Sequence, residues 1–331
     1  METPIGHVPK ESGFIAKYRK HQGWWRTFVL NLPEGKYYNR KTKKQEPVCN
    51  RITGGKTNAD KKNFLSTDIS TEVVRAQEKQ LRDGKGIMEA DRLYNNLLSS
   101  QPLAFNFFGF FRANPDLALA FMKTIRADIV SVEDIVFEYA PESSQDGSAF
   151  DFGFVVSTAT EKGFIGFECK YTDAFSYRRS DNKKYYGEEG DKNFEYYHQI
   201  YLDNNLRFPD EYPTYIRDKN FNQLFRNELL SAQMKPNDFV ITGLFCHHDD
   251  KKSCSAGLEF QKKIGNGENE FILLTYADYF ERMQKLNLKW ETREFVMMLW
   301  ARYCGLGLSK NIILRKCLWP DNISTVRNQW R

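Results

Sequence analysis

The sequence predicts an α/β fold, and three observations support this fold class. Two apolar stretches at residues 149–156 and 163–171 flank a polar turn, which is the pattern of a β-hairpin. Apolar side chains recur at helical spacing in residues 115–126 and 221–233. The expected elements follow one another as helix, strand, strand, strand, helix and strand. This alternation favours a sheet covered by helices over an all-helical or all-β domain.

The remaining elements follow from local signals along the chain. Residues 70–99 have a helical pattern, which DGKG at residues 83–86 breaks into two helices. Asn114 and Pro115 are an N-cap and a first helical residue, and they begin the helix that extends to about Arg126. Residues 130–141 predict a turn and then a strand. Further strands are expected at 239–246 and 271–275, and helices at 279–284 and 290–303.

The hairpin carries charged residues at one end. Strand side chains alternate between faces, so Glu168 and Lys170 share a face and Cys169 points to the other. If Val156 pairs with Gly163, Asp151 lies opposite Glu168 on the same face. A slip of one residue would move Asp151 to the other face, and the sequence leaves both registers open.

Two carboxylates and an ammonium at one end of an apolar hairpin have two interpretations. The carboxylates would repel each other, and a hard divalent cation bound through oxygen relieves that repulsion. A neighbouring lysine would then stabilise developing negative charge or position a water. Alternatively, Glu168 and Lys170 form an exposed ion pair and Asp151 is a charge at the sheet edge.

The order Asp151, hydrophobic strand, Glu168-Cys169-Lys170 resembles the motif of the PD-(D/E)XK nuclease superfamily. Three further stretches are similar to a group of small bacterial restriction-endonuclease-like proteins within it. They are LLSSQPLAFNFFG at 97–109, IVFEYAPE at 135–142 and NQLFRNELL at 222–230. The resemblance covers about residues 89–247, with weaker similarity towards the C-terminus, and we find no counterpart for residues 1–65.

The resemblance implies a restriction-endonuclease-like core, with a mixed sheet flanked by helices in the order αβββαβ. It implies that Asp151, Glu168 and the backbone carbonyl of Cys169 bind Mg²⁺, for which Mn²⁺ would substitute. Glu138, an acid within an apolar strand, becomes a third carboxylate of the site. The alternative interpretation is that Glu138 is a strand residue that faces solvent. Lys170 becomes the catalytic amine.

The helix expected at 221–233 carries a polar face beside its apolar stripe. Gln223 and Arg226 lie three residues apart on that face, next to Asn227. In the resembling proteins a Gln at this place lies over the active centre. We therefore expect Gln223 and Arg226 to contact the catalytic groups or the substrate, although the helix alone predicts only a polar surface.

Charge is unevenly distributed over three expected regions: 1–65, 66–304 and 305–331. Residues 1–65 hold 14 Lys and Arg against 5 Asp and Glu, although the whole chain has a net charge of only +5. The last 27 residues hold five basic groups and one acid, so both ends are basic and the centre is acidic. This distribution suits a protein that binds a polyanion and holds cations. Within the central domain, residues 177–220 form a long polar insertion.

The N-terminal region mixes cations with aromatic rings, which can hold phosphates and stack on bases. Its alternative is a solvated segment whose tryptophans dock on the core. The candidate contacts with nucleic acid are Arg19, Lys20, Trp24, Trp25, Arg26, Arg40, Lys43 and Lys44.

The six cysteines are dispersed and form no CxxC pair, which indicates reduced thiols in a cytoplasmic protein. The sequence shows no secretory signal and no apolar run of membrane length. Cysteines, histidines and aspartates gather at residues 246–254, but their spacing matches no standard zinc site.

Taken together, these features predict a Mg²⁺-dependent endodeoxyribonuclease of restriction or phage-defence type. Its substrate would be double-stranded DNA, and a homodimer would supply one active centre for each strand. Two alternatives stay open. One is a binding protein that has the nuclease fold without the chemistry. The other is a structure-specific or RNA-directed nuclease of repair or mobile-element processing.

Overall fold

The computed structural model describes residues 11–39, 42–53, 62–84, 88–172, 185, 191–203, 211–234, 237–264 and 271–310. Its centre is a five-stranded sheet in the order β3-β4-β5-β6-β7. The strands are β3 (Ser131–Tyr139), β4 (Phe150–Ser157), β5 (Lys162–Lys170), β6 (Phe239–Cys246) and β7 (Phe271–Thr275). The first three strands are antiparallel to one another, and β6 and β7 continue the sheet in parallel with β5. The sheet is therefore mixed, as the sequence predicts.

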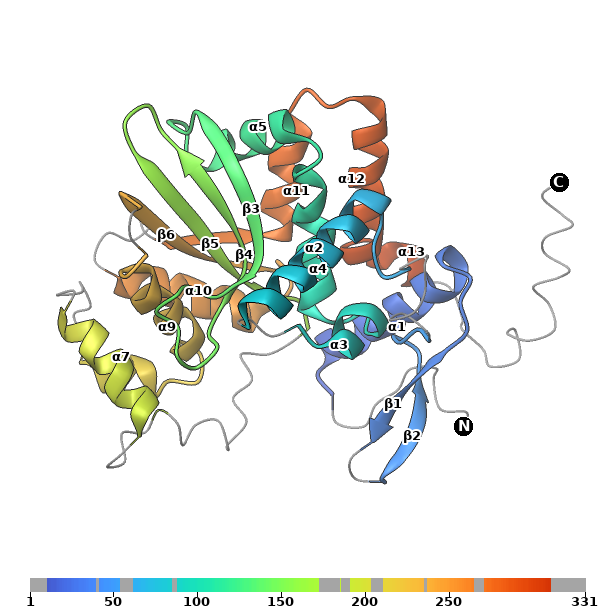
Figure 1. Cartoon of the computed structure of the whole chain (residues 1–331). Helices are drawn as coiled ribbons and strands as arrows, with labels where there is room; N and C mark the ends of the chain where they lie inside the picture. The colour runs from blue at the N-terminus through green and yellow to red at the C-terminus, as the bar shows by residue number, and fades with distance from the viewer. Residues whose placement is uncertain are drawn as a thin grey trace, which may run out of the picture.

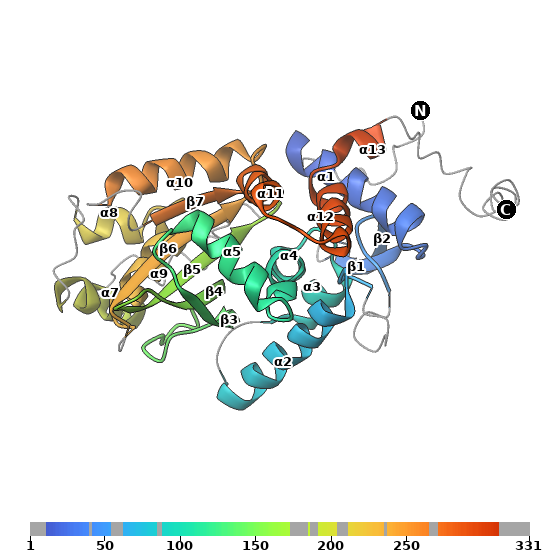
Figure 2. The same cartoon turned by 90° about the horizontal axis from the view of Figure 1, so that it is seen from above.

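Helices cover both faces of this sheet (Figure 1). On one side are α2 (Thr67–Asp83), α4 (Ser100–Phe108), α5 (Pro115–Ile125), α11 (Tyr276–Lys285) and α12 (Trp290–Tyr303). On the other side are α7 (Lys192–Asp203), α8 (Tyr212–Ile216), α9 (Asn222–Ser231) and α10 (Lys251–Lys263). Figure 2 shows α10 and α4 separated by the strands. The chain order α5, β3, β4, β5, α9, β6 confirms the predicted αβββαβ succession.

Each face of the sheet has its own apolar core. The larger core joins the sheet to α4, α5, α11 and α12, and rings dominate it: Phe108 stacks on Phe152 with centroids 3.9 Å apart. The second core lies under α7 to α10 and includes Leu244 and Cys246 of β6. Between the cores, Gly153 leaves room for the Phe164 ring, because a Cβ at Gly153 would lie 2.3 Å from that ring.

The N-terminal region begins with α1 (Gly13–Trp24), a short π-helical turn η1 (Trp25–Val29) and the hairpin of β1 (Gly35–Asn39) and β2 (Lys44–Val48). The hairpin lies away from the large sheet in Figure 1. Helix α1 instead packs on the central domain: Tyr18 belongs to the larger core, and Gln22 donates a hydrogen bond of 2.9 Å to the Tyr171 hydroxyl. Part of the basic N-terminal region is thus integral to the main fold.

The insertion helices and a few short elements complete the described structure. Helices α7 and α8 fall within the predicted polar insertion, and both bury aromatic side chains in the second core. The short helices α3 (Ala90–Asn95) and α13 (Leu306–Lys310) and the 3-10 turn η2 (Gly109–Phe111) connect or end the larger elements. Among the described residues, no helix has the length and apolar content that a membrane crossing requires.

Candidate active site

The hairpin has the register that brings its charged residues together. Val156 pairs with Gly163 and Phe152 with Phe167, so the next position along the ladder sets Asp151 against Glu168. Cys169 lies in the larger core with no exposed surface, on the opposite face from its two charged neighbours. The predicted register is therefore confirmed, and Asp151, Glu168 and Lys170 share the face that α9 covers.

A hydrogen-bonded network holds Lys170 in place on that face. The Lys170 ammonium donates to Glu168 Oε1 at 2.7 Å and to Gln223 Oε1 at 2.8 Å. Asn227, one helical turn after Gln223, donates to the other oxygen of Glu168 at 3.3 Å. Glu168 and Lys170 are each only 6% exposed, so both charges depend on these partners.

Asp151 is held by the backbone of the neighbouring strand. Its Oδ2 accepts a hydrogen bond of 2.5 Å from the Cys169 amide. Burial and the nearby Glu168 carboxylate raise the pKa of Asp151 to about 8, although Lys170 and the Cys169 amide favour the ionised form. Without a cation, the Asp151 carboxyl thus takes up a proton at neutral pH.

Glu138 occupies the matching position on β3. Its neighbours Phe137 and Tyr139 pair with Phe152 and Phe150, so the strand places Glu138 beside Asp151. Its φ of 47° lies in the left-handed region, which costs energy for any residue with a side chain. Such strain often accompanies a functional constraint.

The Glu138 carboxylate accepts a hydrogen bond of 3.0 Å from Gln101, at the start of α4. Burial, followed by repulsion from Asp151, raises the pKa of Glu138 well above its ordinary value, and Glu168 adds to the effect. The neighbouring carboxylates therefore disfavour the ionised forms of Asp151 and Glu138. This is the electrostatic situation that a bound divalent cation relieves, so the residues present fit a Mg²⁺ or Mn²⁺ ion held through oxygen.

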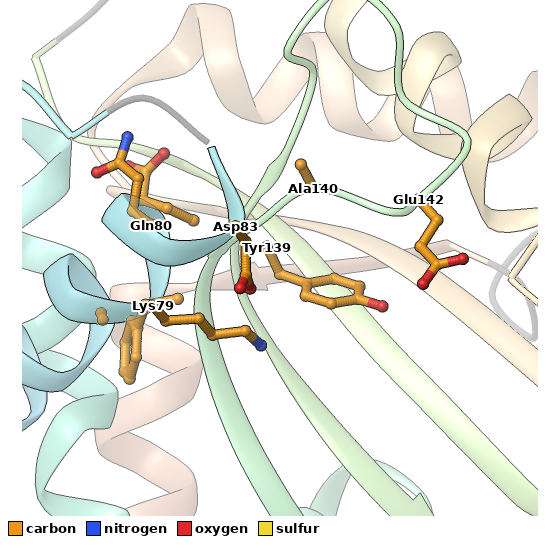
Figure 3. Close-up of a pocket in the computed structure, with 9 residues that line it drawn as sticks. Lys79, Gln80, Asp83, Tyr139, Ala140 and Glu142 are labelled. Carbon is orange, nitrogen blue, oxygen red and sulfur yellow. The ribbon is translucent and has the colours of Figure 1, made fainter. Parts of the chain in front are cut away.

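A cavity of about 380 Å³ opens next to the end of β3, and Glu138 is part of its wall. Figure 3 shows it between α2 and the end of β3, with the Tyr139 ring between Lys79 and Glu142. The Lys79 ammonium lies 5.4 Å from the centre of that ring. Of the three acids, Glu138 lines this recess, which also offers a cation and an aromatic face.

Arg226 hydrogen-bonds to the loop before Asp151, whereas Gln223 hydrogen-bonds to Lys170. Its guanidinium donates to Asp146 Oδ2 at 3.0 Å and to the hydroxyl of Ser148. Asp146 also accepts hydrogen bonds from Tyr185 and Tyr197. Since Asp146 lies in the connection from Glu138 to Asp151, Arg226 anchors the loop that joins two of the acids.

The basic N-terminal residues divide into buried and accessible groups. Trp25 and Arg26 are 2% and 4% exposed, so the expected contact with nucleic acid is wrong for these two side chains, which pack in the interior. Arg19 pairs with Glu11 at 2.8 Å, and both Lys20 and Trp24 are partly exposed. Lys43 and Lys44 are exposed in the β1–β2 hairpin, and Arg40 lies outside the described residues.

The cluster at residues 246–254 does not assemble a zinc site of its own. Within the described residues, the ligand atoms of His247, His248 and Cys304 come within 4.8 Å of one another. However, His247 Nδ1 accepts from the Asp249 amide at 2.9 Å, and its Nε2 contacts the Tyr18 hydroxyl at 2.5 Å. Both ring nitrogens are thus engaged in hydrogen bonds that a metal would have to displace.

Sequence reasoning missed two residues that contact the acids, Gln101 and Asn227. Gln101 lies inside the stretch 97–109 that carries part of the family resemblance, which is a signal for its importance. Asn227 follows Gln223 by four residues, and that spacing puts both on one side of α9.

The family comparison agrees with this geometry. A family model described as the PD-(D/E)XK nuclease superfamily matches residues 9–305. The chain belongs to this superfamily, and its mixed sheet with flanking helices is consistent with a restriction-endonuclease-like fold. Membership indicates a nuclease that uses a divalent metal and acts on nucleic acid. No curated protein and no solved structure matches the chain.

Proposed function

We propose that this protein is a Mg²⁺-dependent endonuclease that hydrolyses phosphodiester bonds of double-stranded DNA, in restriction or phage defence. One observation carries the proposal: Asp151, Glu168 and Lys170 share one face of the β4–β5 hairpin, and Glu138 borders them on β3. Burial and Glu168 raise the pKa of Asp151 to about 8, and strongly shifted pKa values are concentrated at functional sites. When a divalent cation is present, the repulsion between the carboxylates favours binding of that cation.

In this proposal Asp151, Glu168, Glu138 and the Cys169 carbonyl hold the metal. When bound, Mg²⁺ or Mn²⁺ lowers the pKa of a coordinated water and neutralises charge on the phosphate. Asp151 is oriented by the hydrogen bond that its Oδ2 accepts from the Cys169 amide. Glu138 is oriented by Gln101 in the same way.

Lys170 supplies positive charge beside the scissile phosphate. Its ammonium is fixed between Glu168 and Gln223 before substrate arrives, so little reorganisation is needed during the reaction. A fixed charge of this kind stabilises the transition state more than the ground state. Gln223 acts through Lys170 and is a positioning residue.

The substrate would also contact the accessible part of the basic N-terminal region. Lys43 and Lys44 offer exposed ammonium groups, and Lys20 and Trp24 lie partly exposed on α1. Such residues bind the phosphate backbone without reading sequence. A homodimer would bring two active centres to the two strands of a duplex.

The test is cleavage of supercoiled plasmid with Mg²⁺ or Mn²⁺, by the parent and by Asp151→Asn and Lys170→Met. We expect both variants to cut at least about 100-fold more slowly, because each removes a group that faces the reacting phosphate. The matched controls are Asp116→Asn and Lys285→Met, since both residues are exposed and far from the acids in the fold. If Asp151→Asn and Lys170→Met cut as fast as the parent, the proposal is wrong.

Parallel digests separate the proposed substrate from its alternatives. Duplex DNA, single-stranded DNA, branched DNA and RNA are incubated with the parent under identical conditions. Preferred cutting of duplex DNA supports the restriction or defence function. Preferred cutting of branched DNA or RNA would replace it with a repair-type or RNA-directed nuclease. Binding of DNA without any cleavage would indicate a protein that has only the fold.

A further inference from the structure

Two cysteines meet at the end of β6, on the face of the sheet that α10 covers. Cys246 is the last residue of β6, and Cys254 lies in the first turns of α10. Their sulfur atoms are 3.8 Å apart, which is van der Waals contact. Both thiols are free.

We propose that Cys246 and Cys254 form a peroxide-oxidisable thiol pair that closes to a disulfide. The site is independent of the nuclease chemistry, since neither sulfur belongs to the carboxylate cluster. A disulfide needs a sulfur separation of about 2.05 Å, so the two sulfurs approach by roughly 1.8 Å. Rotation of the Cys254 side chain, which is the less buried of the two, supplies this movement.

The surroundings assign different roles to the two thiols. Cys246 is fully buried, whereas Cys254 is partly exposed and so accessible to a small oxidant. The hydrogen bond between the two sulfurs, in which either thiol can donate, lowers the pKa of the Cys254 thiol, and this effect outweighs burial and the nearby Asp250. Cys254 is therefore the thiol that reacts first, because the thiolate is the nucleophile.

The reaction balances with a hydroperoxide as the oxidant. The Cys254 thiolate attacks one peroxide oxygen, the O–O bond breaks, and a sulfenic acid and water (or an alcohol) result. Cys246 sulfur then attacks the Cys254 sulfur, the S–O bond breaks, and a second water leaves with the Cys246 proton. The two thiols lose two electrons in total, and the peroxide gains them.

The bond would join α10 to the sheet beside the active centre. Cys246 pairs with Lys170 across the β5–β6 ladder, so its backbone lies next to the backbone of the catalytic lysine. The Cys254 sulfur also lies 3.5 Å from the His247 carbonyl, inside the turn that the disulfide would close. Oxidation at this place therefore fixes the end of β6 against the first turn of α10.

The experiment treats the whole protein with about one equivalent of hydrogen peroxide, alkylates the remaining thiols and maps tryptic peptides by mass spectrometry. Lys251 and Lys252 separate the two cysteines, so trypsin releases them on different peptides unless a disulfide joins them. We expect one linked pair of peptides, the loss of two thiols per chain and full reversal by dithiothreitol.

Two variants test the assigned order. In Cys246→Ser, Cys254 should remain a sulfenic acid that dimedone traps. In Cys254→Ser, Cys246 should stay reduced under the same peroxide. Cys304→Ser is the control, because Cys304 is likewise partly buried but burial raises its pKa, and it should leave the linked peptides unchanged.

The proposal is overturned if Cys246 and Cys254 of the folded parent are both recovered alkylated after the peroxide treatment. It is equally overturned if peroxide oxidises Cys254→Ser at Cys246 as readily as it oxidises the parent. If Cys246→Ser fails to fold, the parent and Cys254→Ser are sufficient for both of these tests. None of the readouts depends on cleavage of DNA, so a failed nuclease assay leaves the result intact.

Discussion

The side-chain oxygen of Gln223 lies 2.8 Å from the ammonium of Lys170, and this hydrogen bond joins α9 to the end of β5. Gln223 and Lys170 are 53 residues apart in the chain. The bond fixes the direction of a buried cation whose other partner, Glu168, is a candidate metal ligand. The lysine is thus positioned by one neutral and one charged neighbour.

Removal of Gln223 should slow the chemical step without unfolding the protein. In Gln223→Ala the Lys170 ammonium loses a fixed hydrogen-bond acceptor, and we expect cleavage to fall about 10- to 100-fold, as for other supporting residues around metal sites. Single-turnover cleavage at saturating Mg²⁺ measures this. The control is Gln199→Ala on the exposed face of α7, and an unchanged rate in Gln223→Ala would refute the positioning role.

Asp151→Asn should stabilise the metal-free protein while it removes the response to metal. The amide keeps an oxygen that can accept from Cys169, and it removes the cost of protonating or ionising a buried carboxyl next to Glu168. In EDTA we expect a melting temperature a few degrees above the parent, corresponding to about 1 kcal/mol. With Mn²⁺ the parent should gain stability and the variant should not. A variant that is stabilised by Mn²⁺ as much as the parent would exclude Asp151 as a ligand.

The same residue gives a pH dependence with a definite sign. The folded protein raises the pKa of Asp151 from 3.8 to about 8, so the folded state binds a proton more tightly than the unfolded state. The stability contribution of this group is therefore full below about pH 4 and is lost as pH rises towards 8. In EDTA, the advantage of Asp151→Asn over the parent should grow by more than about 1 kcal/mol from pH 6 to pH 9. Urea unfolding at each pH measures it, and a constant or shrinking difference would contradict the assignment.

The backbone strain at Glu138 predicts a trade between stability and activity. Glu138→Gly relieves the positive φ of 47°, and Glu138→Gln keeps it. Both variants lose the carboxylate and should lose cleavage. The glycine variant should be more stable than the glutamine variant by about 1 kcal/mol. If the glutamine variant proves the more stable, the positive φ at Glu138 does not destabilise the folded protein.

The ion pair of Arg226 and Asp146 should matter for folding rather than for metal binding. Arg226→Met leaves a buried carboxylate without its partner, and we expect a loss of about 3 kcal/mol in the free energy of unfolding. The double variant with Asp146→Asn should recover part of this loss. Calorimetric Mn²⁺ titration at low temperature should give the parent's affinity for Arg226→Met. A much weaker affinity with intact stability would instead make Arg226 part of the site.

The sequence predicted the parts of the fold that have a strong period or clear end signals. The β4–β5 hairpin was predictable because both strands are apolar and the turn between them is short and polar, although its register was favoured rather than fixed by the sequence. The bounds of β6, β7 and α12 agree with the prediction to the residue. Helix α4 was not predicted, because all nine of its residues are buried and no polar face marks its period.

Helix α1 is an element whose burial could not be predicted from its sequence pattern. Its many cations indicate a surface segment, yet Tyr18, His21 and Gln22 are buried through contacts with residues more than 100 positions away. Such burial depends on tertiary packing, which a local pattern does not contain. Trp25 and Arg26 were assigned to the surface for the same reason.

The charged members of the candidate site and Gln223 were expected from the sequence, whereas the neutral residues Gln101 and Asn227 were not. Asp151, Glu168 and Lys170 are conspicuous because charges rarely occupy the buried face of an apolar strand. Gln101 and Asn227 carry no charge, and their importance arises only from the carboxylates they contact. On α9, a rotation of one residue separates Asn227 at the site from Arg226 at the loop.

The most direct test of the central claim is the position of Mn²⁺ in crystals of the protein, found from its anomalous scattering. We expect an anomalous peak for a Mn²⁺ ion that is coordinated by the side chains of Asp151 and Glu168 and lies next to Glu138. We expect no such peak in Asp151→Asn. A Mn²⁺-saturated crystal of the parent with no ion between Asp151 and Glu168 would contradict the central claim.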